Sequence, residues 1–126
     1  LTASQTALRH KIVEQFNPPN YVVQNLTYLA VKVLEPIREK IGAFSVSSAY
    51  RSPALNHLVK GSTGSFHLTG CAADIDLGSV KKNKELFEWI KGNLEFTELI
   101  NEYNFDWVHV AIAEGREQER KVKIIK

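Results

Sequence analysis

Two segments of the chain alternate like half-buried strands and direct metal-binding side chains away from their apolar faces. In the segment 71–77, Asp74 falls on the polar face, and in the segment 107–112, His109 falls opposite three β-branched residues. Neighbouring side chains on the same face of paired strands lie about 5 Å apart at Cβ. If these two strands pair, the carboxylate and the imidazole can therefore converge on one metal ion.

A third possible ligand precedes the first of these strands. His67 stands seven residues before Asp74, and Gly70 would let the intervening loop fold tightly enough to bring the imidazole back. Two histidines and one carboxylate leave one zinc position open for water, which is typical of a catalytic site. Asp106, three residues before His109, is the candidate base. Strict alternation would direct Asp106 away from His109, so its role requires the regular strand to begin after it.

Other interpretations of the same residues remain open at this point. The histidines could be ordinary hydrogen-bonded side chains of a globular domain. Asp76 shares a strand face with Asp74 and competes with it as a ligand, although a role in a loop or in orienting a ligand suits it better. Cys71 lies near His67, but its strand face is the apolar one, which favours a buried, unreactive thiol.

The expected secondary structure places helices first and most strands late in the chain. We expect helices at 4–16, 21–41 (kinked at Pro36), 52–61 and 79–91, and strands at 44–50, 71–77, 107–112 and 121–125. The last strand is expected to pair with 107–112 across the polar turn 114–120, and its lysines suit a sheet edge. This order predicts an α+β fold, with a small, mostly antiparallel sheet and helices packed on it.

Length and composition narrow the class of protein. The 126 residues, 44% hydrophobic and 24% charged, suit one globular domain over residues 1–126. Sixteen basic against fourteen acidic residues give a net charge of +2, too small a bias to indicate nucleic acid or a membrane surface as a partner. One cysteine excludes an internal disulfide and a four-cysteine zinc site. A signal peptide removed before Leu1 would leave no trace here.

The spacing of the candidate ligands matches a known motif. Ser65, His67, Gly70, Ala72 and Asp74 spell Ser-x-His-x-x-Gly-x-Ala-x-Asp, and Trp107-Val108-His109 follows near the C-terminus. This pattern resembles the zinc D-Ala-D-Ala carboxypeptidase family, metallopeptidases with the hedgehog/DD-peptidase fold that cut cell-wall peptides containing D-amino acids. The segments 48–61 and 25–38 resemble the family's arginine segment and amino-terminal helix, so the likeness covers nearly the whole chain.

The resemblance implies a role for each matching residue. His67, Asp74 and His109 would bind one zinc ion per chain. Asp106 would take a proton from the zinc-bound water and pass it to the leaving amine. Arg51 would bind and polarise the substrate carbonyl, or bind its carboxylate.

The expected substrate contacts are less strongly determined than the ligands. The resemblance implies that Ser65 hydrogen-bonds the substrate, and Trp107 is expected to line the cleft because it lies beside His109 on the same strand face. Asp106 replaces the glutamate of some family branches, and Ala49 stands where glycine is expected. Neither departure removes a metal ligand, so they bear on the substrate more than on the chemistry.

The sequence therefore predicts a monomeric zinc peptidase that hydrolyses amide bonds in peptidoglycan stem peptides. It would act at the bacterial cell wall or in the periplasm, encoded by a bacterium or a phage, and either as a carboxypeptidase or as an endopeptidase. The alternative is a non-catalytic zinc-binding recognition domain of the same fold. Asp106 and Arg51 argue against that alternative, because recognition alone requires neither.

Overall fold

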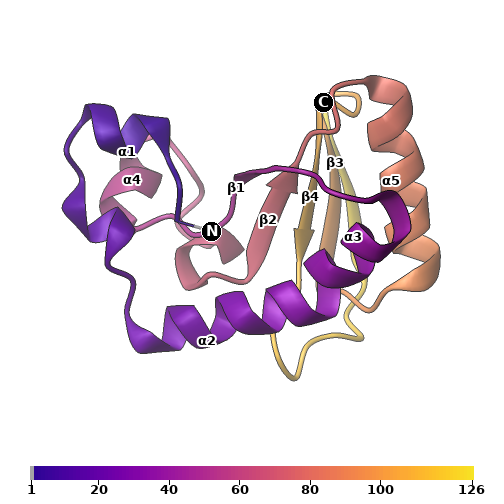
Figure 1. Cartoon of the computed structure of the whole chain (residues 1–126), viewed down its shortest axis with the longest axis horizontal. Coiled ribbons are helices and arrows are strands. Elements are labelled where there is room, and N and C mark those ends of the chain that lie inside the picture. Colours follow the sequence, from indigo (N-terminus) through magenta and orange to yellow (C-terminus); the bar gives the residue numbers. More distant parts are fainter. Residues whose placement is uncertain (1) are drawn as a thin grey trace.

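A five-stranded sheet organises the molecule, which is described for residues 2–126 by a computed structural model (Figure 1). Its strands are β1 (Val46–Ser48), β2 (Ala72–Ile75), β3 (Glu98–Glu102), β4 (Trp107–Ala111) and β5 (Lys121–Ile125). The strand order is β1-β2-β4-β3-β5, and every pairing is antiparallel except that of β3 with β5. The predicted α+β fold with a mostly antiparallel sheet is confirmed.

The α-helices are α1 (Gln5–Arg9), α2 (Asn20–Leu29), α3 (Glu35–Ile41), α4 (Pro53–Leu58) and α5 (Val80–Asn93). Two 3₁₀ turns, η1 (Val13–Phe16) and η3 (Phe66–Thr69), and one π-helical turn, η2 (Ala30–Leu34), complete the set. In the part of the chain that the structure describes, no helix is both long and apolar enough to cross a membrane.

Two predicted helices differ in detail from the structure. The expected helix at 4–16 is divided into α1 and η1, and Lys11 between them has a φ of 55°, which a helix does not allow. The expected helix at 21–41 is continuous but contains η2 directly before α3. Pro36 lacks the N–H that an α-helical turn would need at this point, and the wider turn precedes it.

The hydrophobic core covers one face of the sheet. Val108, Val110 and Ile112 point into it from β4 and the residue after it, where they are buried against α5 and the helical segment 20–41. Figure 1 shows α5 running alongside β3 and β4. Each such side chain contributes roughly 1.5–3 kcal/mol when fully buried. Because strand side chains alternate, Trp107 and His109 project from the opposite face, which is free for a site.

The position of β5 corrects the predicted pairing. The segment 121–125 pairs with β3 and not with 107–112, because β3 lies between them in the sheet. The segment 98–102 was not expected to be a strand. The loop after β4 therefore passes the start of β3 at Glu98, and β5 runs parallel to β3 on its outer side. The expectation that the C-terminal lysines lie on an edge strand is confirmed.

Candidate metal centre

The three predicted ligands meet on the free face of the sheet. Asp74 of β2 lies directly opposite His109 of β4 in the antiparallel register, and His67 approaches from η3. One possible ligand atom from each residue lies within 4.8 Å of the other two. His67 and His109 are buried, with 1% and 6% exposed surface, whereas Asp74 is partly open to the cleft. The convergence that the sequence predicted is therefore present.

Local backbone structure brings His67 to this point. The Ser65 hydroxyl accepts a hydrogen bond from the His67 N–H at 3.1 Å and caps η3. Gly70 ends η3 with a φ of 77°, and a Cβ atom there would lie 2.9 Å from the Val22 carbonyl oxygen. Only glycine meets both conditions without strain, so the tight return from His67 into β2 depends on Gly70.

Each histidine ring has an acceptor on the side away from Asp74. His67 Nδ1 lies 2.5 Å from the Ala49 carbonyl oxygen, and His109 Nε2 lies 3.0 Å from Glu98 Oε1. In the neutral rings, protons on these two nitrogens would leave the lone pairs of His67 Nε2 and His109 Nδ1, which lie 3.2 and 3.1 Å from Asp74 Oδ1, available to a metal. Histidines that bind metals usually donate their second ring proton in this way.

The spacing of these atoms fits a tetrahedral metal site. Bonds of about 2.0–2.1 Å at tetrahedral angles place neighbouring ligand atoms roughly 3.3 Å apart. The two separations from Asp74 Oδ1, 3.2 and 3.1 Å, are close to that value. With all three ligand atoms within 4.8 Å of one another, His67, Asp74 and His109 would hold a divalent ion after a small adjustment of their side chains.

Within the cluster of His67, Asp74 and His109, each charged form stabilises the other. Burial alone would raise the pKa of Asp74, but hydrogen bonds from His109 and His67 outweigh it and hold that pKa well below its usual range. Burial alone would lower the pKa of His109, but hydrogen bonds to Asp74 and Glu98 raise it to about 9. The carboxylates are therefore ionised at neutral pH, as metal ligands must be, and a metal would have to displace a proton from His109.

A cleft of about 530 Å³ opens over the cluster. Besides the three ligands, its lining includes the polar and aromatic side chains Arg51, Lys60, Ser65, Glu98, Glu102, Trp107 and Lys123. The predicted substrate residues Arg51, Ser65 and Trp107 therefore share one cavity with the metal ligands.

Arg51 is positioned as a donor at the wall of the cleft. Its Nη2 lies 3.4 Å from Ser65 Oγ, while its buried Nε has no hydrogen-bond partner among residues 2–126. Burial lowers the pKa of this guanidinium, which remains charged at neutral pH. A Cβ at Gly61 would lie 2.9 Å from Arg51 Nη1, so the glycine makes room for the side chain. A charged guanidinium at the wall of the cleft is suited to a carbonyl or carboxylate oxygen of a ligand.

The cleft contains two carboxylates outside the cluster, Glu98 and Glu102, which the sequence analysis missed. Glu102 is the one that does not contact a histidine ligand. It lies opposite Trp107 in the register of β3 and β4, and its Oε2 accepts a 2.6 Å hydrogen bond from Trp107 Nε1. Burial and the negative charge of Asp74 raise the pKa of Glu102. A carboxylate with a raised pKa at the edge of a metal site is suited to proton transfer.

Asp106, the base that the motif indicates, occupies a different environment. Its side chain is exposed and is not among the described residues that line the cleft. Its N–H donates to the Glu102 and Tyr103 carbonyls, and its own carbonyl accepts from Asn83 Nδ2. The regular strand begins after it, at Trp107, as its predicted role required. Its assignment as the base remains a prediction.

Two further residues have the roles expected of them. Asp76 accepts hydrogen bonds from the Gly78 N–H and from Asn83 Nδ2, which makes it a loop residue and not a ligand. Cys71 is buried, and burial raises the pKa of its thiol, so it is poorly suited to act as a nucleophile.

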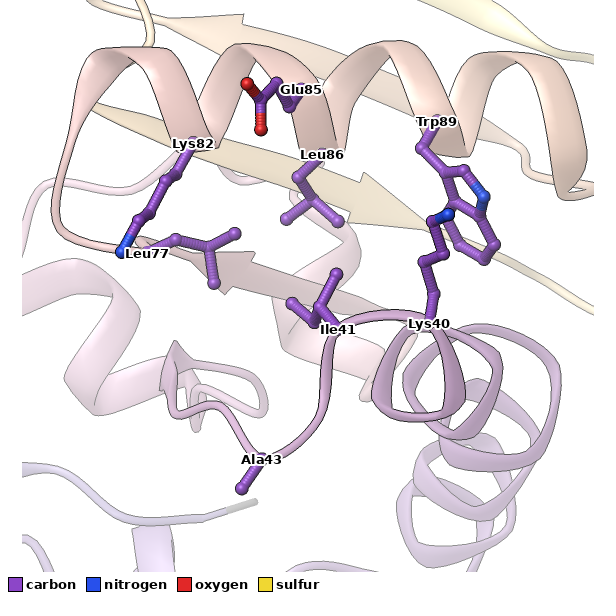
Figure 2. A pocket seen from close by; sticks show the side chains of 8 residues that line it. All are labelled: Lys40, Ile41, Ala43, Leu77, Lys82, Glu85, Leu86 and Trp89. Carbon is purple, nitrogen blue, oxygen red and sulfur yellow. The ribbon is translucent and has the colours of Figure 1, made fainter.

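A second cavity, of about 370 Å³, lies between α3 and α5 and shares no lining residue with the cleft (Figure 2). Aliphatic side chains and Trp89 form most of its wall, with Lys40, Lys82 and Glu85 as the charged members. One carboxylate without histidine or cysteine does not make a metal site. The metal chemistry of the described chain therefore belongs to the cleft.

Glu98 and Glu102 were not identified from the sequence because the strand that carries them, β3, was not predicted. The segment Glu98-Leu99-Ile100-Asn101-Glu102 alternates, but its outward face combines two acidic residues with an isoleucine, which does not read as a polar face. The two-residue spacing of Leu99 and Asn101, which both lie on the buried face, is the pattern that could have indicated this strand.

The comparison with known families agrees with this geometry. A family model described as Peptidase M15 matches residues 1–111, which include the three candidate metal ligands, Arg51, Glu102 and Asp106. No curated protein matches the chain significantly. The match confirms the resemblance that the motif suggested, and the site contains the ligand set that a metallopeptidase requires. The chain belongs to the peptidase M15 family.

Proposed function

We propose that this protein is a zinc-dependent peptidase that hydrolyses amide bonds in peptidoglycan stem peptides. The observation that carries the proposal is the cluster of His67, Asp74 and His109, with both rings oriented by second acceptors, at the base of a cleft that also contains Arg51. The donor set of two imidazoles and one carboxylate, with an open position, is typical of catalytic zinc. The protein would act as a monomer, at the bacterial cell wall or in the periplasm.

The Arg51 guanidinium supports a substrate with free carboxylates, within a lining that has three cationic side chains and the three carboxylates of Asp74, Glu98 and Glu102. Arg51, Lys60 and Lys123 place cationic groups around the cluster, and Arg51 offers a buried donor without a partner among the described residues. Stem peptides present carboxylates next to the amide bonds that such enzymes cut. Trp107 and Tyr103, whose rings lie 5.1 Å apart, supply an aromatic wall for the apolar parts of the peptide.

In the proposed reaction a water molecule attacks the amide carbonyl carbon. When bound, zinc supplies a Lewis acid that makes water a nucleophile near neutral pH. Arg51 binds the carbonyl or a neighbouring carboxylate, and Ser65 adds a hydrogen bond to the substrate. A carboxylate accepts the proton of the attacking water and passes it to the leaving nitrogen, so that the C–N bond breaks as an acid and an amine form.

For the proton-accepting carboxylate, geometry favours Glu102 and the sequence motif favours Asp106. Glu102 lines the cleft and has a raised pKa, whereas Asp106 is exposed outside it. Glu102→Gln is expected to lower the hydrolysis rate by about 10²–10⁴-fold, the usual contribution of a general base. Asp106→Asn, at the residue that the motif indicates, lowers the rate by the same factor if Asp106 accepts the proton and leaves the rate near the wild-type value if Glu102 does.

The test is mass spectrometry of defined muropeptides incubated with the zinc-loaded protein, the chelated protein and these two variants. Loss of one D-alanine would identify a carboxypeptidase, and cleavage within the stem would identify an endopeptidase. Tight zinc binding without cleavage of any muropeptide would contradict the proposal and indicate a recognition domain.

A further inference from the structure

A line of polar contacts connects the outermost strand with a metal ligand. Lys123 Nζ of β5 lies 3.0 Å from Glu98 Oε2, and the other oxygen of the same carboxylate, Oε1, lies 3.0 Å from His109 Nε2. His109 Nδ1 in turn faces Asp74 Oδ1 at 3.1 Å. Lys123 and Glu98 therefore stand in series behind the ligand and are not ligands themselves.

Burial increases along this line toward the metal centre. The side chain of Lys123 is 53% exposed, that of Glu98 is 12% exposed and that of His109 is 7% exposed. A nearly buried carboxylate that accepts the Nε2 proton determines which ring nitrogen of His109 faces the cluster. With Lys123 on its second oxygen, the carboxylate has a partner on each side and little freedom to rotate.

Strand β5 is itself firmly attached, although it lies at the edge of the sheet. At its start, the Arg120 guanidinium donates to the carbonyls of Leu94 and Lys91, and the Lys121 N–H donates to the Thr97 carbonyl. At its end, the Ile125 carbonyl accepts a 2.7 Å hydrogen bond from Tyr103. Lys123, midway between these attachments, is thus held beside Glu98 by backbone structure.

We propose that β5 forms the outer layer of the metal centre, where Lys123 positions Glu98 and Glu98 positions the ligand His109. The family model ends at residue 111, so this layer lies outside the matched segment. The inference rests on the proposed function in one respect, that His67, Asp74 and His109 bind zinc. It assigns Glu98 and Lys123 as positioning residues, and neither is assigned a contact with substrate.

The test is the zinc affinity of single variants, measured by competition with a chromophoric chelator. Loss of a residue that orients a ligand typically weakens metal binding by 10–100-fold, which is the effect expected of Glu98→Ala. Lys123→Met keeps the aliphatic stem and removes the charge. Because the ion pair with Glu98 is exposed on the lysine side, we expect zinc affinity to fall by up to about fivefold. Lys123→Arg is expected to restore the wild-type affinity.

Lys121→Met is the matched control. Lys121 lies on the same strand with nearly the same exposure, 54%, but pairs with Glu119 and not with Glu98. Its substitution is expected to leave zinc affinity unchanged. The visible spectrum of the cobalt-substituted protein should change in Glu98→Ala and not in Lys121→Met, because the spectrum reports the geometry of the ligands. Urea denaturation of each metal-free variant checks that it is folded.

The results separate this inference from the proposed function. Equal zinc affinity of the wild type and folded Glu98→Ala, or equal losses in Lys123→Met and Lys121→Met, would overturn the inference while leaving the peptidase proposal intact. A wild-type protein that binds no zinc would overturn both. A protein that shows the expected affinities but cuts no muropeptide would support the inference and contradict the peptidase.

Discussion

The two histidine ligands are oriented by acceptors of different kinds. His67 donates to the neutral carbonyl of Ala49, whereas His109 lies between the carboxylates of Glu98 and Asp74. A carboxylate stabilises an imidazolium far more than a carbonyl does. Although burial alone would lower the pKa of His109, its two carboxylate partners raise it. Proton binding at His109 therefore links the metal centre to pH.

This link predicts how the stability of the metal-free protein depends on pH. Hydrogen bonds lower the pKa of Glu98 from 4.5 to about 2, and they hold that of Asp74 well below its ordinary 3.8. The two carboxylates therefore stabilise the folded protein above about pH 4.5, and this stabilisation is lost on acidification. The contribution of His109 is complete below its ordinary pKa of 6.5 and is lost as the pH rises toward 9. The free energy of unfolding should therefore be greatest between about pH 4.5 and 6.5.

Urea denaturation in the presence of a chelator, at pH 5.5, 7.5 and 9, would measure this dependence. His109→Gln should remove the alkaline decline, because it removes the group that titrates there. A decline that persists unchanged in that variant would refute the assignment to His109.

Gly70 provides a second prediction for a single residue. Gly70→Ala places a Cβ in the left-handed region, which costs about 1–2 kcal/mol, and 2.9 Å from the Val22 carbonyl oxygen, which adds strain. We expect a loss of about 2–3 kcal/mol in the free energy of unfolding, together with weaker zinc binding because His67 is displaced. Both quantities can be measured by urea denaturation and chelator competition.

The control for this variant is Gly92→Ala. Gly92 lies inside α5 with no atom near the position of an added Cβ, so alanine should stabilise the protein by roughly 0.5–1 kcal/mol. If Gly70→Ala were equally harmless, the turn after η3 would not need its glycine.

At the level of elements, the sequence predicts those features that depend on the alternation or spacing of residues within one segment. Asp74 and His109 follow from the alternation of β2 and β4, and His67 from its spacing to Asp74, so the ligand cluster is predictable. Glu98 and Glu102 are not, because they depend on β3, whose mixed outward face hides its alternation. The same omission explains the wrong partner for β5. Which distant strands pair depends on all the strands of the sheet, so the pattern of one segment does not predict its partner.

Asn83 attaches α5 to the loops around the site, and this attachment predicts how its substitution changes stability. Asn83 is buried in α5. Its Nδ2 lies within hydrogen-bond distance of Asp76 Oδ1 and of the Phe105 and Asp106 carbonyls, and its Oδ1 accepts from the Leu77 N–H. Asn83→Ala leaves several of these groups unpaired and should lower the free energy of unfolding by about 2–3 kcal/mol.

Asn93→Ala is the corresponding control, because within residues 2–126 the exposed Asn93 side chain bonds only to the Trp89 carbonyl of its own helix. It should change stability by less than about 0.5 kcal/mol. Equal effects of the two substitutions, measured by urea denaturation, would show that Asn83 does not join α5 to the loops.

At the level of the whole molecule, the metal centre joins parts that are distant in the sequence. Its ligands come from η3, β2 and β4, and their supports come from β3, β5 and the segment before α4. Since only the folded chain brings these together, zinc should stabilise it. At a free zinc concentration 100 times the Kd, the expected gain in the free energy of unfolding is about 2.7 kcal/mol.

Thermal denaturation with and without a chelator would measure this gain, and His67→Ala should abolish it. A melting temperature of the wild type that is the same with zinc and with chelator would show that the cluster binds no zinc under these conditions.

The arrangement of β5 also has a practical consequence for handling the protein. Ile125 lines the cleft, so any segment joined after Lys126 begins at the rim of the substrate site. An affinity tag or a surface-immobilisation linker placed there would compete with the substrate for space, and a histidine tag would bring imidazoles beside the cluster. Ala3, near the other end of the chain, lines a depression formed with residues 44–49 and does not line the cleft, so that end is the better position for tags and labels.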